Sequence, residues 1–496
     1  MIHIPELITF FRSGFPKLLA FSAAFSFFII CNAQPVNIKV NIKGLKNDTV
    51  YITYPLGGPS ITVQADTTVL KSGKGRFVSD IKFHPGLYSF VTGGKKYDFI
   101  MPLNNQNFSV SFDTVNYLKS VRAKGSKENT GLFDYMRFMS EKRIMLYDLE
   151  NKSDDTDSLI RKKALIELTK LYDEVDKYRD KILTANDGNT LGKFLKAYSD
   201  IEIPDSPAGE ADSLYEYNYY RTHFFDNADY ANPELARMPV LEGKINEYIS
   251  SVMSLLPDTA ILETDRMLTR ASAHPENFRI TLNTLFNTYI QSQMIVSENV
   301  WVHIAEKWVI PYAGWYSPEY INSLKEEVTL RENSLIGKIA KPFNATLIPT
   351  EHFVAADADS TIKEDLLAGN PISVLPLLDG KINILYFWEP NCGHCRLVTP
   401  DLYRIYRKFS PLGLRVVAVQ TNNTAQGKAD WIDFVNENKL YNWPNIWSPD
   451  DYQYKLDYNV SSTPRIYIIE HGSHRILIKN IGMEQLEDII TNNITL

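Results

Sequence analysis

Residues 382–395 read INILYFWEPNCGHC, and this stretch decides the fold of the C-terminal part of the chain. The apolar run 382–388 predicts a buried strand. Beyond the second cysteine, apolar side chains recur at the spacing of one helix face, at Leu397, Val398, Leu402, Ile405, Tyr406 and Phe409. Cys392 and Cys395 therefore lie where a strand ends and a helix begins.

This position gives the two cysteines a chemical role. The first turn of a helix offers unpaired N–H groups and the positive end of the helix dipole, and both stabilise a thiolate. The thiolate is the attacking species of a cysteine, and a Cys-x-x-Cys pair at a helix start can have its first pKa well below the free value of about 8.5. We therefore expect Cys392 to be the reactive thiol.

The segments around this stretch predict an α/β domain over residues 334–496. An extended segment, 334–348, and a polar loop, 349–370, come before the first strand. The predicted helix 393–409 is followed by a strand at 414–419, a helix at 428–438, a short strand near Ile446, strands at 466–469 and 476–478, and a helix at 484–491. Strands that alternate with helices and end in a hairpin are typical of an α/β sheet.

The first 33 residues predict a signal peptide. Two basic residues precede an apolar run, 18–30, which is too short to span a bilayer comfortably. Ala33 suits cleavage at its carboxyl side, so the mature chain is predicted to be exported and periplasmic or envelope-associated. Lipidation of Cys31 or an uncleaved anchor is the alternative, but a lipoprotein signal would have a small residue where Ile30 stands.

Charge and cysteine content limit the possible functions. The chain has 496 residues, enough for about three domains, and a formal charge of −7 that argues against a nucleic-acid partner. Cleavage removes two basic residues and one acidic residue, which brings the charge to −8. It also leaves Cys392 and Cys395 as the two cysteines. A disulfide that closes so small a loop removes little entropy from the unfolded chain, so a purely structural disulfide is a poor explanation for the pair.

Residues 34–125 predict a small antiparallel sandwich or barrel. Apolar residues alternate with polar ones at Val36, Ile38, Val40 and Ile42, and glycine pairs separate the later short runs. This region has no cluster of histidine, cysteine or carboxylate residues at the spacing of a metal site.

Residues 126–333 predict a helical domain without a catalytic motif. A loop is expected at 201–217, and later helices at about 240–255, 258–271, 276–295 and 298–309. The aromatic segment 215–225 fits packing between helices better than a peptide or partner groove. His303 and Glu306 lie on one helix face and could hold a metal, but no third ligand stands near them in sequence.

The C-terminal residues resemble the thioredoxin-like superfamily, and within it the exported TlpA-like disulfide reductases. The resemblance covers about 335–496 and rests on the cysteine pair and four further features: a GKIAKPF motif at 337–343, Phe387-Trp388 before the cysteines, Pro400 in the next helix, and Thr463-Pro464. The β and helical segments resemble the paired N-terminal domains of unknown function that precede thioredoxin domains in secreted proteins of Gram-negative envelopes.

This resemblance implies a thiol–disulfide oxidoreductase, either a reductase or an isomerase, with a redox-active Cys392–Cys395 disulfide and no metal, flavin or nucleotide. Cys392 would attack a substrate disulfide and Cys395 would resolve the mixed disulfide. The reactivity of the pair would be tuned by Gly393, His394 and Glu389. The substrate groove would be formed by four residues: Thr463, the cis-proline Pro464, Trp388 and Asn391.

The implied partners follow from the same resemblance. They are envelope proteins that carry disulfides and an upstream dithiol protein that donates electrons. Nucleic acid is not expected, and membrane contact is expected only through a lipid or an uncleaved anchor.

The chain departs from the family at two positions. Thioredoxins carry a buried acid six residues before the first cysteine, which assists deprotonation of the resolving cysteine, and here that position is Tyr386. Glu389 would substitute only in part, from the rim. The Gly393-His394 dipeptide resembles the one in protein disulfide isomerase. The reduction potential of that isomerase is about −180 mV and that of thioredoxin about −270 mV, and the gap corresponds to roughly 4 kcal/mol. The dipeptide alone does not fix the potential.

Three other functions are alternatives to this prediction. An envelope binding or adaptor protein would use the C-terminal domain as a redox switch or scaffold, since the upstream regions make up about two thirds of the chain. A peroxidase would carry a motif rich in proline and threonine before a single cysteine, which residues 388–391 do not resemble. A zinc site would need two more ligands, and the nearby candidates, His471 and His474, flank a predicted hairpin turn.

Overall fold

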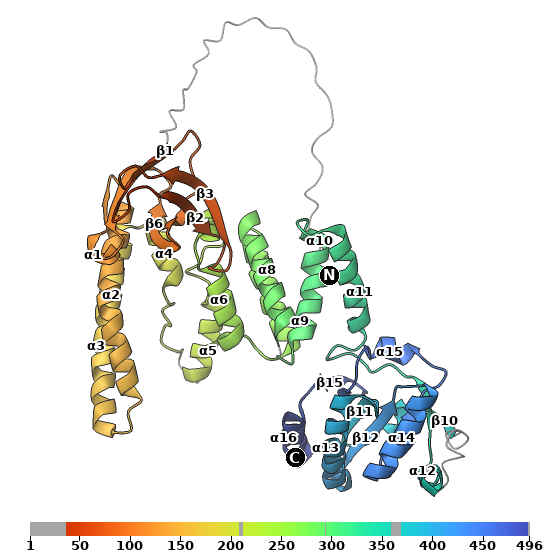
Figure 1. The fold of residues 1–496 in the computed structure, drawn as a ribbon. Coiled ribbons are helices and arrows are strands. Elements are labelled where there is room, and N and C mark those ends of the chain that lie inside the picture. The colour runs from red at the N-terminus through yellow and green to blue at the C-terminus, as the bar shows by residue number, and fades with distance from the viewer. Residues whose placement is uncertain (1–35, 208–211, 293, 359–368, 495–496) are drawn as a thin grey trace, which may run out of the picture.

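The computed structural model describes residues 36–207, 212–292, 294–358 and 369–494, and the predicted signal segment 1–33 lies outside them. A β-rich region, a helical region and a mixed α/β region follow one another, with the first and last at opposite ends of the molecule (Figure 1). This multi-domain arrangement confirms the predicted fold class. Over the described residues, no helix combines the length and apolar character needed to cross a membrane.

The N-terminal region consists of two four-stranded sheets, ordered β4-β1-β7-β8 and β3-β2-β5-β6. The sheets enclose one apolar core, to which Leu132 and Phe133 of the first long helix also belong. The elements of this region are β1 (Val36–Lys43), β2 (Thr49–Pro55), β3 (Thr62–Val69), β4 (Lys74–Ser79), β5 (Gly86–Thr92), β6 (Lys95–Met101), β7 (Asn107–Asp113), α1 (Tyr117–Ser120) and β8 (Arg122–Lys124).

The helical region begins where Ser126 caps α2, because its hydroxyl accepts a hydrogen bond from the Asn129 N–H at 3.2 Å. The long pair α2 and α3 projects from the β-rich region (Figure 1). The elements are α2 (Lys127–Ser153), α3 (Ser158–Ala185), α4 (Thr190–Tyr198), α5 (Asp212–His223), η1 (Pro233–Arg237), α6 (Leu241–Glu247), η2 (Tyr248–Val252), α7 (Pro257–Ala271), α8 (Pro275–Gln291), α9 (Ser297–Ile304), η3 (Ala305–Val309), α10 (Ile310–Tyr312) and α11 (Pro318–Glu332).

The C-terminal region is a seven-stranded sheet ordered β10-β9-β13-β12-β11-β14-β15 with helices packed on it. Strand β11 pairs with β12 in parallel and with β14 antiparallel, so it lies in the interior of the sheet. The elements are β9 (Asn344–Leu347), α12 (Thr350–Ala358), β10 (Asn370–Ser373), η6 (Leu375–Leu377), β11 (Ile382–Trp388), α13 (Gly393–Phe409), η7 (Ser410–Leu412), β12 (Leu414–Gln420), α14 (Ala425–Asn438), β13 (Asn445–Trp447), α15 (Gln453–Asp457), β14 (Arg465–Glu470), β15 (Ile476–Lys479) and α16 (Met483–Ile494).

Two loop predictions are wrong in part. Residues 350–358 form helix α12 because Phe353 is almost fully buried and packs edge-on against Trp431 of α14 at a ring-centroid distance of 5.3 Å. Helix α5 starts at residue 212, inside the predicted loop 201–217. In the aromatic segment, Phe224 and Phe225 are buried among the helices, which confirms the packing interpretation for these two residues.

The helical region meets the C-terminal sheet through a buried ion pair, which we call the junction. Lys479 of β15 places its Nζ 2.6 Å from Oε2 of Glu298 in α9, and the lysine side chain is only 4 % exposed. The side-chain amide of Asn299 donates to the Ile336 carbonyl at 2.8 Å and its oxygen accepts from the Ile336 N–H at 3.3 Å. Lys479 stands at the end of β15 that pairs with Tyr467, three residues beyond Pro464.

Candidate functional site

The two cysteines lie at the start of α13, as predicted, but in different surroundings. Cys392 is the N-cap of the helix, and its sulfur accepts a hydrogen bond from the Cys395 N–H at 3.3 Å. Its Sγ also lies 3.2 Å from the Thr463 carbonyl oxygen, to which the thiol can donate. Cys392 is partly exposed, whereas Cys395 is fully buried, and both are free thiols. Only Cys392 is open to an incoming substrate.

The surroundings also separate the acidities of the two thiols. Partial burial opposes ionisation of Cys392, but hydrogen bonds from the Cys395 thiol and from the backbone N–H groups of Cys395 and His394 outweigh it and lower its pKa. Burial, with the neighbouring Cys392 sulfur, raises the pKa of Cys395 to about 12. At neutral pH, Cys392 is therefore the thiol that forms a thiolate more readily.

Alkylation should reveal this difference directly. Because the pKa of Cys392 lies below its ordinary value, its thiolate is already populated at a pH where an ordinary cysteine is still a thiol. We expect the rate of addition of the first iodoacetamide group to reach half its maximum at a lower pH in the folded, reduced chain than in the unfolded chain. Mass spectrometry of the singly alkylated product gives the profile, and the urea-unfolded chain is the control. Coinciding midpoints would contradict the lowered pKa.

Thr463 and Pro464 lie opposite the reactive cysteine. The peptide bond between them is cis, both residues are partly buried, and β14 begins at the next residue. The exposed residues Ser461 and Ser462 precede them, so the backbone facing Cys392 is open on one side. Asn391 is exposed as well, and its amide donates to Asp430 of α14 at 2.6 Å.

The prediction that Trp388 lines the rim is wrong. Its side chain is completely buried, stacked at 6° on the Tyr386 ring and 5.4 Å from the Phe434 ring. The reason is that β11 is covered on both faces, so its side chains enter a core whichever way they point. Trp388 therefore belongs to the core beside the site and not to the surface that a substrate would contact.

Tyr386 occupies the position that holds a buried acid in thioredoxins. Its hydroxyl lies 2.7 Å from the Thr399 hydroxyl, which in turn donates to the Cys395 carbonyl at 2.7 Å. Burial raises the pKa of Tyr386 well above its usual value, so the phenol stays neutral. The chain Tyr386–Thr399–Cys395 therefore ties the helix to the sheet by neutral hydrogen bonds. The sequence did not single out Thr399, although it lies four residues after Cys395.

The three residues expected to tune the pair have different surroundings. Glu389 is partly buried, and its carboxylate accepts a hydrogen bond from the Thr421 hydroxyl at 2.7 Å. Gly393 and His394 are exposed, and His394 acts on the Cys392 sulfur through its backbone N–H. Glu389 is thus fixed beside the loop after β12, and the His394 ring is free to meet a partner.

The histidine positions considered as metal ligands have other surroundings. His303 lies 2.9 Å from Asp265, whose carboxylate also accepts hydrogen bonds from Lys307 and Trp308. His474 lies in the turn between β14 and β15, where its carbonyl accepts from the Ala340 N–H. Within the part of the chain that the structure describes, no three histidine, cysteine or carboxylate residues are grouped as in a metal site.

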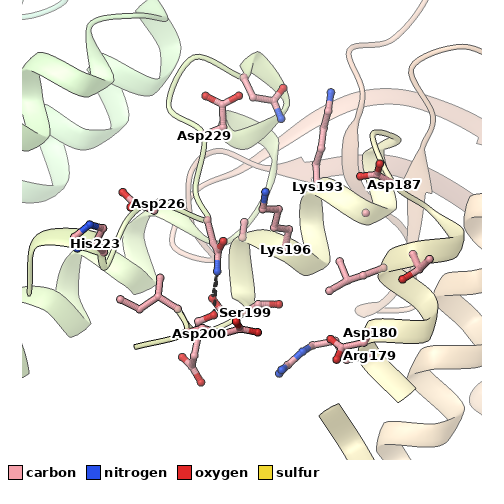
Figure 2. A pocket seen from close by; sticks show the side chains of 18 of the residues that line it. Arg179, Asp180, Asp187, Lys193, Lys196, Ser199, Asp200, His223, Asp226 and Asp229 are labelled. Atoms are coloured by element: carbon pink, nitrogen blue, oxygen red, sulfur yellow. Dashed lines mark hydrogen bonds between the residues drawn. The ribbon is translucent and has the colours of Figure 1, made fainter. Parts of the chain in front are cut away.

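A large cavity, about 1130 Å³, lies in the helical region rather than beside the cysteines (Figure 2). Asn227, one of the lining residues, donates a hydrogen bond to the Ser199 carbonyl at 3.1 Å. Carboxylates outnumber cations in its wall, in which Figure 2 labels Arg179, Asp180, Asp187, Lys193, Lys196, Asp200, Asp226 and Asp229. None of its lining residues belongs to the C-terminal region.

Comparison with known families agrees with this geometry. Residues 380–476, which contain the cysteines and the cis-proline, match a family model described as thioredoxin-like. The C-terminal region is a thioredoxin-like domain. Residues 36–132 match a second model, described as a domain of unknown function, which covers the β-rich region and the first turns of α2.

Two curated proteins are related to the chain over part of its length. A thioredoxin-like protein of Haemophilus influenzae is 27 % identical over 106 residues, 21 % of this chain and 59 % of that protein. The thiol:disulfide interchange protein HelX of Rhodobacter capsulatus is 25 % identical over 138 residues, 28 % of this chain and 73 % of that protein.

Solved structures are similar over one or more regions. A thioredoxin-like protein from Bacteroides caccae aligns over 59 % of this chain and 99 % of its own, with 16 % identity and a TM-score of 0.41. A domain of a possible thiol-disulfide isomerase from Cytophaga hutchinsonii aligns over 32 % of this chain and 92 % of its own, with 25 % identity and a TM-score of 0.25.

Proposed function

We propose that the protein is a thiol–disulfide oxidoreductase that exchanges disulfides through Cys392 and Cys395. The observation that carries the proposal is the asymmetry of the pair: a partly exposed thiol of lowered pKa caps α13, and a buried thiol of raised pKa lies one turn further on. A nucleophile and a resolving thiol need these two environments. The thioredoxin-like domain supports the same reaction class.

The reduction of a substrate disulfide would proceed in two balanced steps. The Cys392 thiolate attacks one substrate sulfur, the substrate S–S bond breaks, and the other substrate sulfur leaves as a thiolate that takes up a proton. Cys395 then loses its proton and attacks Cys392, which forms the Cys392–Cys395 disulfide and releases the second substrate thiol. The substrate gains two electrons, and a dithiol donor protein must return them to the pair. An isomerase would instead release the rearranged substrate before the second step is complete.

The Thr463 carbonyl defines where the substrate chain would bind. It contacts the Cys392 thiol at 3.2 Å, and β14 pairs with β11 immediately after the proline. A peptide in extended conformation that paired with the Thr463 backbone would carry its disulfide to the Cys392 sulfur. Asn391 and His394 are exposed beside this position and would contact the same peptide.

The proposed place of action is the cell envelope, outside the cytoplasm. The predicted signal segment 1–33 would send the protein across the inner membrane, where disulfides form and persist. The substrates would then be disulfide-bearing envelope proteins. The donor would be another dithiol protein of that compartment.

Trapping the mixed disulfide tests the proposed function. In the Cys395→Ser variant the first step can occur but the resolving thiol is missing, so we expect substrate proteins to accumulate as bands that disappear on reduction. The variant is expressed as the full chain in its host envelope, acid-quenched and separated on non-reducing gels. The matched control is Cys392→Ser/Cys395→Ser, which should trap nothing. Equal bands in both variants, or none in either, would contradict the exchange mechanism.

A further inference from the structure

A second cavity of the helical region, which we call the α5–α7 cavity, has a volume of about 530 Å³. It is lined by residues of α5, of the loop after it, of η2, of α7 and of η3. Aromatic rings form part of its wall: Phe225, Tyr230 and Tyr248. Rings at the wall of a concave site offer apolar surface to a small ligand. No residue of the thioredoxin-like domain contributes to this cavity.

The hydroxyl of Tyr230 has no hydrogen-bond partner. The residue is 4 % exposed, and its backbone is held in place because its carbonyl accepts from the Asn277 side-chain amide at 2.7 Å. Burial raises the pKa of Tyr230 above its usual value, so the group stays protonated and can act as a donor. A buried hydroxyl without a partner is unfavourable in a folded protein, and a bound group that accepts a hydrogen bond removes that penalty.

The charges of the cavity favour an anion. Its wall carries four cations and two carboxylates. Arg221, Arg270 and Lys307 are each paired with a carboxylate: Glu263, Asp226 and Asp265, respectively. Arg266 is exposed and has no ion-pair partner among the described residues. One unpaired positive charge beside an apolar wall attracts a negative group that carries apolar surface.

We propose that the α5–α7 cavity binds a carboxylate attached to an apolar or aromatic group. The carboxylate of the ligand forms an ion pair with Arg266, and an oxygen of the ligand accepts a hydrogen bond from the Tyr230 hydroxyl. The apolar group packs against Phe225 and Tyr248. Two sources share this chemistry: a free small acid, and the C-terminus of a polypeptide whose last residue is apolar. Binding at this site needs neither cysteine, so this proposal can be tested independently of the proposed disulfide exchange.

Calorimetric titration of the full chain with matched probes tests the proposal. N-acetyl-L-phenylalanine supplies both features, its amide lacks the charge, and acetate lacks the apolar group. We expect the acid to bind at least tenfold more tightly than the amide, a difference of about 1.4 kcal/mol, and acetate not to bind. A pentapeptide of four alanines and a free C-terminal phenylalanine separates the sources. Binding as tight as that of the acid indicates a polypeptide terminus, and tenfold weaker binding indicates a free small acid.

Two substitutions assign the binding to the named residues. Tyr230→Phe should lower the affinity for N-acetyl-L-phenylalanine about tenfold. The melting temperature without ligand should stay the same or rise, because the lost hydroxyl has no partner in the protein. Arg266→Gln should lower the affinity for the acid but not for the amide. Arg143→Gln, the same change on the exposed face of α2, should alter neither affinity. Equal affinity for acid and amide, no binding of either, or a Tyr230→Phe chain that melts several degrees lower without ligand would overturn the proposal.

Discussion

Replacing Cys392 by serine is expected to abolish turnover of a protein disulfide. The serine hydroxyl does not ionise near neutral pH, so the attack on the substrate sulfur has no nucleophile, and Cys395 is too deeply buried to replace it. The rate should fall by at least about a thousandfold, as it does when other enzymes lose their nucleophile. The measurement is insulin reduction by dithiothreitol in the presence of the full chain, followed as turbidity.

The control for this experiment establishes that the variant is folded. Circular dichroism of Cys392→Ser should match the unsubstituted chain, because the serine oxygen can still accept the hydrogen bond that caps α13. Residual activity of a tenth or more in a folded Cys392→Ser chain would refute the role given to Cys392.

Glu298→Gln is expected to destabilise the fold because it breaks the ion pair of the junction. The substitution leaves the ammonium of Lys479, with its side chain 4 % exposed, without a counter-charge at the junction. Burial lowers the pKa of Lys479 and Glu298 opposes that shift, so loss of the carboxylate removes the group that favours the charged lysine. Removing one partner of a buried ion pair typically costs about 3–5 kcal/mol. Urea unfolding followed by tryptophan fluorescence measures the change.

A neighbouring glutamate provides a matched control. Glu327 pairs with Arg331, as Glu298 also does, but its side chain is 49 % exposed. An exposed pair contributes about 0–1 kcal/mol, so Glu327→Gln should have a small effect. Adding Lys479→Met to Glu298→Gln should restore much of the lost stability, because the unpaired charge is then gone. Equal effects of the two glutamate substitutions would mean that the junction pair is no stronger than a surface pair.

The local parts of the site could be predicted from the sequence. The apolar run before Cys392 and the helical spacing after Cys395 are short-range patterns, and strand β11 and helix α13 follow from them. The role of the Thr463-Pro464 pair opposite the cysteines came only from the resemblance. Its approach to Cys392 is a contact between residues 71 positions apart, which no periodicity reveals.

Two of the errors have the same physical cause, which is burial set by distant parts of the chain. Trp388 was expected at the rim because it stands next to the cysteines, but the layers on both sides of β11 enclose it. Helix α12 was expected to be a loop because its sequence is mostly polar and small, and the contact between Phe353 and Trp431 stabilises it. The junction and the α5–α7 cavity likewise join residues that are far apart in sequence.

Tyr386 has a consequence for how the redox potential of the cysteine pair changes with pH. Because the phenol beneath the pair stays neutral, it exchanges no proton when the cysteines are oxidised. Below the pKa of Cys392, two protons accompany two electrons, and the midpoint potential should fall by about 59 mV per pH unit. Above it, only the Cys395 proton remains, and the slope should halve to about 30 mV. A buried carboxylate at position 386 would add a further break to this line, whereas with a tyrosine there the only bend below the pKa of Cys395 reports the acidity of Cys392.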